Sequence, residues 1–329
     1  MLDKVTIVGG GSWATALVKI FSESHVWVEW LVRDQDTAQF IMTRRHNPRY
    51  LSYVALDTTL VNATVDPIEA IVDSDLVIFA VPSAYFQDTI DKLDKKAIED
   101  KRLAVSIKGF ITGTGCTPSE FLVGVLEKRS AITVLGGPCH AEEIAANRCT
   151  YLTIGSSDTQ VIRDLHASLQ SPYLNTVSNA DPVGIEYAAI LKNITGIATG
   201  IAGGLNYGDN FQAVLVCNAM KEANAFLNCI LPAERDLCDS AYFGDLLVTA
   251  YSDHSRNRTL GKLIGKGMII RNAIEATGMI AEGFYAAREL NQLVNKLPLS
   301  LPVMTCVYRI LHQHANPYQE FKLLEKKLR

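Results

Sequence analysis

The sequence predicts an α/β fold with a doubly wound parallel sheet in its first half and an all-helical domain in its second. Short β-branched runs alternate with helical patterns through the first half. A glycine-rich turn follows the first of these runs directly. Strand patterns nearly vanish after residue 180, where long helical patterns begin. The 329 residues therefore predict two domains, 1–180 and 181–329.

Seven runs in the first half have the character of strands. Several are apolar throughout, which is typical of strands that are buried on both faces of a parallel sheet. They are residues 4–8, 26–32, 75–81, 103–107, 132–135, 151–154 and 174–177. Helical patterns lie between them, for instance at residues 13–22 and 117–128.

The second half opens with a helix start signal. Asp181 is a residue type that caps helices, and Pro182 is tolerated at the first helical position. Helical patterns then occupy residues 183–200, 210–227, 237–251, 259–266, 270–277, 280–293 and 301–313. No internal repeat or low-complexity linker separates the halves, so the boundary is expected near residues 178–182.

Composition excludes several classes of protein. There are 31 Lys plus Arg against 35 Asp plus Glu, and no strongly basic stretch, so a nucleic-acid partner is not expected. The seven cysteines form no C-x-x-C pair, which argues against a disulfide framework or a zinc site and favours a reducing compartment. No run of 18 apolar residues and no signal-peptide pattern occurs. We therefore expect a cytoplasmic protein without stable membrane insertion.

A glycine loop follows the first strand. The chain reads Gly9-Gly10-Gly11-Ser12-Trp13-Ala14, a G-x-G-x-x-A motif between a strand and a helix. Gly9 permits the tight turn, Gly11 lets the backbone approach a pyrophosphate, and Ala14 keeps the helix close to the strand. A glycine turn without a ligand is the alternative. The position of the motif in the opening βαβ unit favours a dinucleotide in a Rossmann-type domain.

The end of the second strand bears on the choice between NAD and NADP. An acid there bonds the ribose 2′-OH of NAD, whereas an arginine accommodates the 2′-phosphate of NADP. Arg33 and Asp34 stand side by side. We favour Arg33 as the cofactor contact and leave the preference open.

Two later loops follow predicted strands at the edge where ligands of open α/β sheets bind. Lys108 follows the fourth strand, although a lysine after a buried strand is most often only a loop charge. The sharp turn Gly137-Pro138 follows the fifth and enters a helix near Ala141, another place for an anion or cofactor. Cys139 and His140 resemble a nucleophile and a base, but adjacent residues rarely share one reacting centre, so covalent catalysis is not expected.

Lys192 is an isolated charge in an apolar helical pattern. Burial of an ammonium is costly, and Glu186 lies six residues away, the wrong spacing for an ion pair on one helix face. We therefore expect a lysine that exchanges a proton with a substrate oxygen. Asp245 is similarly isolated, with Thr249 one turn later, and is the expected partner of Lys192.

The segment Ser255-Arg256-Asn257 precedes another helical pattern. An arginine at a helix start beside Ser and Asn side chains suits a phosphate or carboxylate. A capping segment with solvated arginines explains the same residues equally well, and both interpretations stand.

Taken together, these residues resemble the bacterial NAD(P)-dependent glycerol-3-phosphate dehydrogenases from Val5 to about Arg309. Each motif alone occurs in many proteins, but their order and spacing along the chain are specific to this family. The matching segments are residues 9–13, Asn47-Pro48-Arg49-Tyr50-Leu51, residues 80–83, Lys108-Gly109, residues 137–143, Leu191-Lys192-Asn193, residues 244–246, residues 255–258 and residues 281–283.

The resemblance implies reversible reduction of dihydroxyacetone phosphate to sn-glycerol 3-phosphate, a precursor of glycerophospholipids, with NAD or NADP and no metal. It implies that Lys192 is the catalytic acid/base, supported by Asp245, Lys108 and Thr249. The implied substrate contacts are Lys108, Gly137, Cys139, Lys192, Asp245, Ser255, Arg256 and Asn257. The implied cofactor contacts are Gly9, Gly11, Ser12, Trp13, Arg33, Lys108, Ala141, Arg256, Ile280 and Glu282. The apolar helical half is a candidate homodimer interface.

The chain departs from the family's pattern at a few positions. Cys139-His140 replaces the usual Ser or Thr then Phe, and Cys217-Asn218-Ala219 stands where Thr-Arg-Gly is common. Ala14 replaces a glycine, and Ile107 a small residue. Two rival functions stay open at this point: another lysine-using dehydrogenase with a helical second domain, which acts on a β-hydroxy acid or a keto acid, and a dinucleotide-sensing module without turnover.

Overall fold

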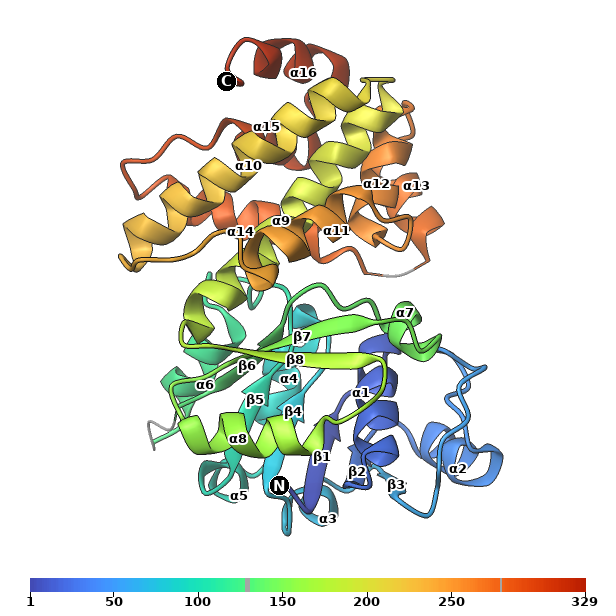
Figure 1. The fold of residues 1–329 in the computed structure, drawn as a ribbon. Coiled ribbons are helices and arrows are strands. Elements are labelled where there is room, and N and C mark those ends of the chain that lie inside the picture. The colour runs from blue at the N-terminus through green and yellow to red at the C-terminus, as the bar shows by residue number, and fades with distance from the viewer. Residues whose placement is uncertain (128–130, 279) are drawn as a thin grey trace. The chain divides into compact units, whose positions relative to one another are not determined.

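The computed structural model describes residues 1–127, 131–278 and 280–329 (Figure 1). The chain forms two compact units. Unit 1 combines Met1–Ile107 with Pro118–Ile185, and unit 2 combines Lys108–Thr117 with Glu186–Arg329. The division after Ile185 falls a few residues beyond the expected boundary, inside a helix. The short segment Lys108–Thr117 groups with the C-terminal unit.

Unit 1 contains an eight-stranded sheet in the order β3-β2-β1-β4-β5-β6-β7-β8. Neighbouring strands are parallel except for β6 and β7, which are antiparallel, so β7 and β8 run against the other six. The strands are β1 (Lys4–Val8), β2 (Trp27–Leu31), β3 (Val61–Thr64), β4 (Leu76–Phe79), β5 (Arg102–Val105), β6 (Thr133–Gly136), β7 (Thr150–Gly155) and β8 (Leu174–Asn179). The predicted doubly wound sheet is confirmed, with this reversal at one edge.

The central strands of the sheet are buried on both faces because helices cover them. Every residue of β4 is buried, as are the last four residues of β1. The helices of unit 1 are α1 (Ser12–Glu23), α2 (Gln35–Arg44), α3 (Pro67–Ile71), α4 (Phe86–Asp91), α5 (Lys95–Glu99), α6 (Pro118–Val125), α7 (Ala141–Ala145) and α8 (Thr159–Ser168). Lys128, the last residue of the helix expected at 117–128, lies outside the described residues.

The regular elements of unit 2 are all helices among its described residues, as the sequence predicts, whereas its segment Lys108–Thr117 forms no helix. Its helices are α9 (Pro182–Gly204), which begins in unit 1, α10 (Asp209–Ile230), α11 (Asp245–Tyr251), α12 (Arg256–Gly265), α13 (Ile270–Thr277), α14 (Glu282–Val294), α15 (Pro302–Gln313) and α16 (Pro317–Glu325). Asp181 caps α9 as expected, because its carboxylate accepts a bond of 3.0 Å from the Gly184 backbone N–H. No helix in the described ranges is both long enough and apolar enough to cross a membrane.

Glycines let two helices of unit 2 approach closely. A Cβ at Gly200 of α9 would lie 2.1 Å from the Arg258 carbonyl oxygen of α12, and one at Gly261 of α12 would lie 2.1 Å from the Ile197 carbonyl oxygen. Only hydrogen atoms fit at both positions. This contact brings the N-terminal turn of α12 against the middle of α9, where Lys192 and Asn193 lie.

Candidate active site

The glycine loop has the geometry that the motif predicts. Gly9 has φ +134°, and a Cβ there would lie 2.6 Å from the Ala80 carbonyl oxygen. Gly11 is different: its φ of −84° suits any residue, and a Cβ there would meet no protein atom within 4 Å. The turn itself therefore requires glycine at position 9, while position 11 leaves space for a group to approach the backbone. Ser12 begins α1, so the loop fits a pyrophosphate.

Asp34 beside the end of β2 has a local role. Its Oδ1 accepts hydrogen bonds from the Thr37 backbone N–H at 2.8 Å and the Thr37 hydroxyl at 2.7 Å, which caps α2. These bonds, assisted by the charges of Arg49 and Arg33, hold the pKa of the Asp34 carboxyl below its usual value. The Arg33 side chain is 80% exposed, and its Nε lies 3.7 Å from Asp34 Oδ2.

Trp13 is held by a hydrogen bond to the end of β5. Its indole N–H donates to the Ser106 hydroxyl at 2.7 Å, and that hydroxyl donates to the Leu135 carbonyl oxygen at 2.8 Å. The side chain of this expected cofactor contact is therefore fixed within unit 1, close to the carboxyl end of a central strand.

The loop between β6 and α7 holds three expected site residues. Gly137 has φ +95°, and a Cβ there would lie 3.0 Å from Thr153 Oγ1, so glycine is required. The Cys139 thiol is buried and donates to the Gly137 carbonyl oxygen at 3.2 Å. Ala141 is the first residue of α7. The thiol bonds its own loop, which supports a role in shaping the turn.

Two lysines converge on one buried carboxylate in unit 2. Asp245 begins α11 and is 1% exposed. Its Oδ1 accepts a hydrogen bond from Lys192 Nζ on α9, and Lys108 Nζ lies 3.3 Å from its Oδ2. The ion pair expected between Lys192 and Asp245 is thus present, and Lys108 joins it.

This cluster can hold and move a proton in a dry environment. Lys192 is 6% exposed, and the Lys108 side chain is 22% exposed. A carboxylate between two ammonium groups offsets part of the cost of burying them. Thr249, also buried, donates its hydroxyl to the Asp245 backbone carbonyl at 2.8 Å. It therefore fastens the turn of α11 that carries Asp245.

A chain of asparagine amides crosses the same unit. The Asn193 Nδ2 donates to the Lys108 carbonyl oxygen at 2.8 Å, and its Oδ1 accepts from Asn257 Nδ2 at 3.0 Å. Asn257 Oδ1 in turn accepts from the Gly283 backbone N–H at 2.9 Å. The sequence indicates Asn193 only as part of the Leu191-Lys192-Asn193 motif. Nothing in a single sequence marks an asparagine in an apolar helix as a link between three segments.

The start of α12 combines a cap with an arginine. Ser255 is the N-cap, and its hydroxyl accepts from the Arg258 backbone N–H at 3.3 Å. Arg258 pairs with Asp253 at 2.8 Å, and Arg256 is the first residue of the helix. The capping interpretation is therefore correct for Ser255, and it leaves an anion-binding role for Arg256 compatible with the geometry.

Two further expected contacts lie at the start of α14. Glu282 is its first residue, and Ile280 is half-buried two residues before it. The neighbouring Gly283 leaves no room for a side chain, since a Cβ there would lie 2.5 Å from the Asn193 carbonyl oxygen. The start of α14 is thus pressed against the same part of α9 that carries Lys192.

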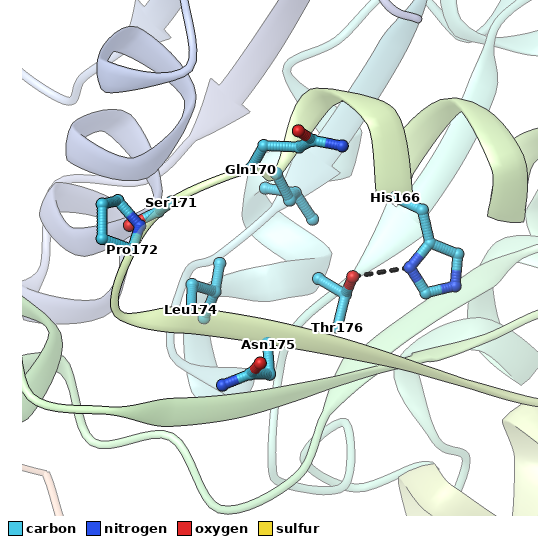
Figure 2. A pocket seen from close by; sticks show the side chains of 8 residues that line it. His166, Gln170, Ser171, Pro172, Leu174, Asn175 and Thr176 are labelled. Atoms are coloured by element: carbon cyan, nitrogen blue, oxygen red, sulfur yellow. Dashed lines mark hydrogen bonds between the residues drawn. The ribbon is translucent and has the colours of Figure 1, made fainter.

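A separate pocket lies on unit 1 between α8 and β8 and has a volume of about 500 Å³ (Figure 2). His166 points toward Thr176 there, with Nδ1 2.5 Å from the hydroxyl oxygen. None of the expected site residues lines this pocket. In the described ranges, no group of three or more His, Cys, Asp or Glu side chains is arranged to hold a metal ion.

Comparison with known families gives two matches that together span most of the chain. A family model described as NAD-dependent glycerol-3-phosphate dehydrogenase N-terminus matches residues 4–162. The corresponding C-terminus model matches residues 181–322.

Individual proteins agree. A glycerol-3-phosphate dehydrogenase (NAD(P)+) of Syntrophomonas wolfei is 33% identical over 97% of this chain and 93% of its own length. One from Clostridium botulinum is 33% identical over 99% of both chains. The crystal structure of glycerol-3-phosphate dehydrogenase from Coxiella burnetii superposes with a TM-score of 0.92 at 29% identity, covering 98% of each chain. A ketopantoate reductase from Ralstonia eutropha shares the fold, with a TM-score of 0.60 at 18% identity, covering 98% of this chain and 99% of that one.

Proposed function

Because the chain belongs to the NAD-dependent glycerol-3-phosphate dehydrogenase family, we propose that it interconverts dihydroxyacetone phosphate and sn-glycerol 3-phosphate with NAD or NADP. The observation that carries this proposal is the buried cluster of Lys192, Asp245 and Lys108. A protein that only senses a dinucleotide needs no such proton donor.

In this proposal, residues 1–180 form the dinucleotide-binding domain and residues 181–329 the substrate domain, and each also contributes a few contacts to the other ligand. The glycine loop, with Gly9, Gly11, Ser12 and Trp13, holds the pyrophosphate end of the cofactor. The other proposed cofactor contacts are Arg33, Lys108, Ala141, Arg256, Ile280 and Glu282. When bound, the nicotinamide supplies the hydride to the C2 carbonyl carbon, or accepts it in the reverse direction.

Lys192 is proposed to be the general acid/base. Its ammonium donates a proton to the C2 oxygen during reduction, which neutralises the charge that develops there. Asp245 holds the ammonium in place for the reacting oxygen, and Thr249 fixes the backbone of Asp245. Lys108 provides a second positive charge on the same carboxylate and is a further candidate contact to substrate.

The phosphate of the substrate is proposed to bind at the start of α12. Arg256 supplies charge there, with Ser255 and Asn257 beside it and Gly137 and Cys139 as further contacts. Binding energy from the remote phosphate would help to fix the geometry of the reacting carbon.

The decisive assay follows oxidation of NADPH and NADH at matched concentrations with dihydroxyacetone phosphate or ketopantoate, and reduction of NADP+ and NAD+ with 3-hydroxyisobutyrate. We expect turnover with dihydroxyacetone phosphate. Turnover with ketopantoate or 3-hydroxyisobutyrate instead would make this chain a dehydrogenase of a keto or hydroxy acid. Cofactor binding without turnover on any of the substrates would favour a sensor.

Two variants test the residue roles. Lys192→Ala should lower kcat by about a hundredfold or more, while the matched Lys322→Ala, an exposed lysine paired with Glu325, should not.

Arg256→Ala should impair reduction of dihydroxyacetone phosphate more than reduction of an unphosphorylated ketone. Equal losses on both substrates would contradict a phosphate site.

We further propose that the enzyme works in the cytoplasm, supplies glycerophospholipid synthesis and forms a homodimer through its helical half. No helix among the described residues is long and apolar enough to cross a membrane, which is compatible with this location. Sedimentation of the purified protein tests the dimer.

A further inference from the structure

The carbonyl oxygens of the glycine loop are held from inside unit 1 by three side chains of different elements. The Trp30 indole N–H donates to the Gly9 carbonyl oxygen at 2.6 Å. Asn47 Nδ2 donates to the Gly10 carbonyl oxygen at 3.1 Å. The Thr15 hydroxyl donates to the Gly11 carbonyl oxygen at 3.0 Å. We call these three contacts the carbonyl brace.

Asn47 is the hub of the brace. Its Nδ2 also donates to the Thr15 hydroxyl oxygen at 2.9 Å, so it supports two of the three contacts. Its Oδ1 accepts from the backbone N–H groups of Arg49 at 2.9 Å and Tyr50 at 3.1 Å. Asn47 is 1% exposed, and Thr15 and Trp30 are fully buried. One amide therefore ties the segment after α2 to the backbone of the glycine loop.

The brace determines where the loop's N–H groups point. No cis peptide occurs in the described chain, and in a planar trans peptide the N–H points opposite to the C=O. Because the carbonyls of Gly9, Gly10 and Gly11 face the brace, the N–H groups of the following residues face the other way. A Cβ at Gly10 or Gly11 would meet no protein atom within 4 Å. The N–H groups are thus directed away from the protein interior, toward the side from which an anion can approach.

We propose that Asn47 is a positioning residue for the cofactor: by fixing the carbonyls of the glycine loop, it preorganises the loop's N–H groups for the pyrophosphate. This inference rests on the proposed dinucleotide function. It gives the Asn-x-x-Tyr-Leu segment a role that neither the motif nor the catalytic cluster explains.

Two variants weaken the brace by different means. Asn47→Asp keeps the acceptor for Arg49 and Tyr50 but places an oxygen against the Gly10 carbonyl. Thr15→Val removes the hydroxyl between Asn47 and Gly11 and keeps the shape of the side chain. The matched control is Thr133→Val, which removes another buried hydroxyl of unit 1, bonded to Ser156 Oγ at 3.1 Å and not to the loop.

The measurement is the Kd for NADPH and for ADP, each by calorimetry, together with kcat and the KM for dihydroxyacetone phosphate at saturating NADPH. Both brace variants should raise both Kd values about tenfold, as expected for losing a hydrogen bond that organises an anion site. Their kcat and substrate KM should stay within about twofold of wild type, and Thr133→Val should change none of these values.

The outcomes separate the two proposals. Brace variants that bind NADPH and ADP as tightly as wild type would overturn the role of Asn47 and leave the dehydrogenase function intact. A wild-type protein that binds neither ligand would overturn the dinucleotide function itself. If Asn47→Asp does not fold, as judged by its melting curve, Thr15→Val still tests the part of the brace that runs from Asn47 through Thr15 to Gly11, and unchanged Kd values would overturn that part.

Discussion

At the scale of single residues, the central feature is one buried carboxylate shared by two lysines. Asp245 balances charge that would otherwise be costly to bury in this part of unit 2. Its removal has two consequences, because the carboxylate both stabilises the fold and keeps Lys192 in place.

Asp245→Asn should therefore lower kcat/KM about a hundredfold and the free energy of unfolding by about 3 kcal/mol. Steady-state kinetics and urea unfolding measure the two effects. Asp253→Asn is the control, since Asp253 is exposed and its pair with Arg258 is solvated. Wild-type kinetics in Asp245→Asn would contradict the proposed cluster.

Arg33 carries a prediction on cofactor choice. The Asp34 carboxylate is already occupied by Thr37, whereas the Arg33 side chain extends into solvent. Arg33→Ala should raise the Kd for NADPH about tenfold and leave the Kd for NADH within about twofold. Arg271→Ala, on an exposed helix of unit 2, is the control. An equal loss for both cofactors would argue against a contact between Arg33 and the 2′-phosphate.

The sequence predicts some of these residues better than others. Lys192 and Asp245 could be found because a lone charge in an apolar pattern needs a partner. Asn193 and Asn47 could not, because their importance depends on which distant backbone atoms their amides reach. Lys108 was expected in the dinucleotide domain, since it follows a strand of the sheet. The structure groups it with unit 2, where its partner Asp245 lies 137 positions further along the chain.

At the scale of elements, close packing of α9 on α12 supports the site. Gly200→Ala would place a methyl group 2.1 Å from the Arg258 carbonyl oxygen, so the helices must separate. We expect a loss of about 3 kcal/mol in unfolding free energy, with reduced activity because Asn193 and Asn257 move apart.

The same helix offers a matched control. A Cβ at Gly203 has only the Gln212 Nε2 within 4 Å, at 3.8 Å. Gly203→Ala should be neutral or stabilise the protein by about 0.5–1 kcal/mol through helix propensity. Urea unfolding of both variants gives the comparison, and similar stabilities would contradict the close contact.

Glu222 links two other helices and predicts a dependence on pH. This acid of α10 is 7% exposed, and it accepts hydrogen bonds from the Val303 N–H at 2.7 Å and the Met304 N–H at 3.1 Å at the start of α15. Burial raises the pKa of its carboxyl from 4.5 to about 7 against the opposing effect of those bonds.

Between these two values the folded protein holds a proton that the unfolded chain has lost. The stability contributed by Glu222 should therefore fall as the pH rises from about 4.5 to about 7, and then level off. Relative to Glu222→Gln, wild type should lose on the order of 2 kcal/mol between pH 5 and pH 8 in urea unfolding. Glu275→Gln, an exposed acid, is the control. Parallel pH profiles for wild type and Glu222→Gln would contradict the raised pKa.

The elements differ in how well their sequences predict them. The expected and observed bounds of α13 agree, because its apolar spacing is regular and Gly278 ends it. β3 was missed because Val-Asn-Ala-Thr has too few apolar residues to stand out from a loop. The helix expected at 237–251 begins later, with a π-helical turn at Ser240–Gly244 before α11. α16 begins at Pro317 and was not expected, because its short apolar face gives a weak pattern.

At the scale of the whole molecule, the net charge of −4 conceals how the basic residues are used. The proposed ligands are anions, and the chain as a whole does not attract them. The positive groups assigned to them are Lys108, Lys192, Arg256 and Arg33. Local placement, which composition does not report, therefore determines whether an anion can bind.

The segment Lys108–Thr117 has a consequence for how the protein is made. It leaves the ribosome between two parts of unit 1, yet its partners lie in segments that are synthesised later. The Lys108 carbonyl bonds Asn193, its ammonium bonds Asp245, and the Gly113 N–H bonds Glu289. Domains generally fold in the order in which they are translated. This stretch cannot make these three contacts until Asn193, Asp245 and Glu289 have emerged, so the cluster at Asp245 is completed long after Lys108 itself has been synthesised.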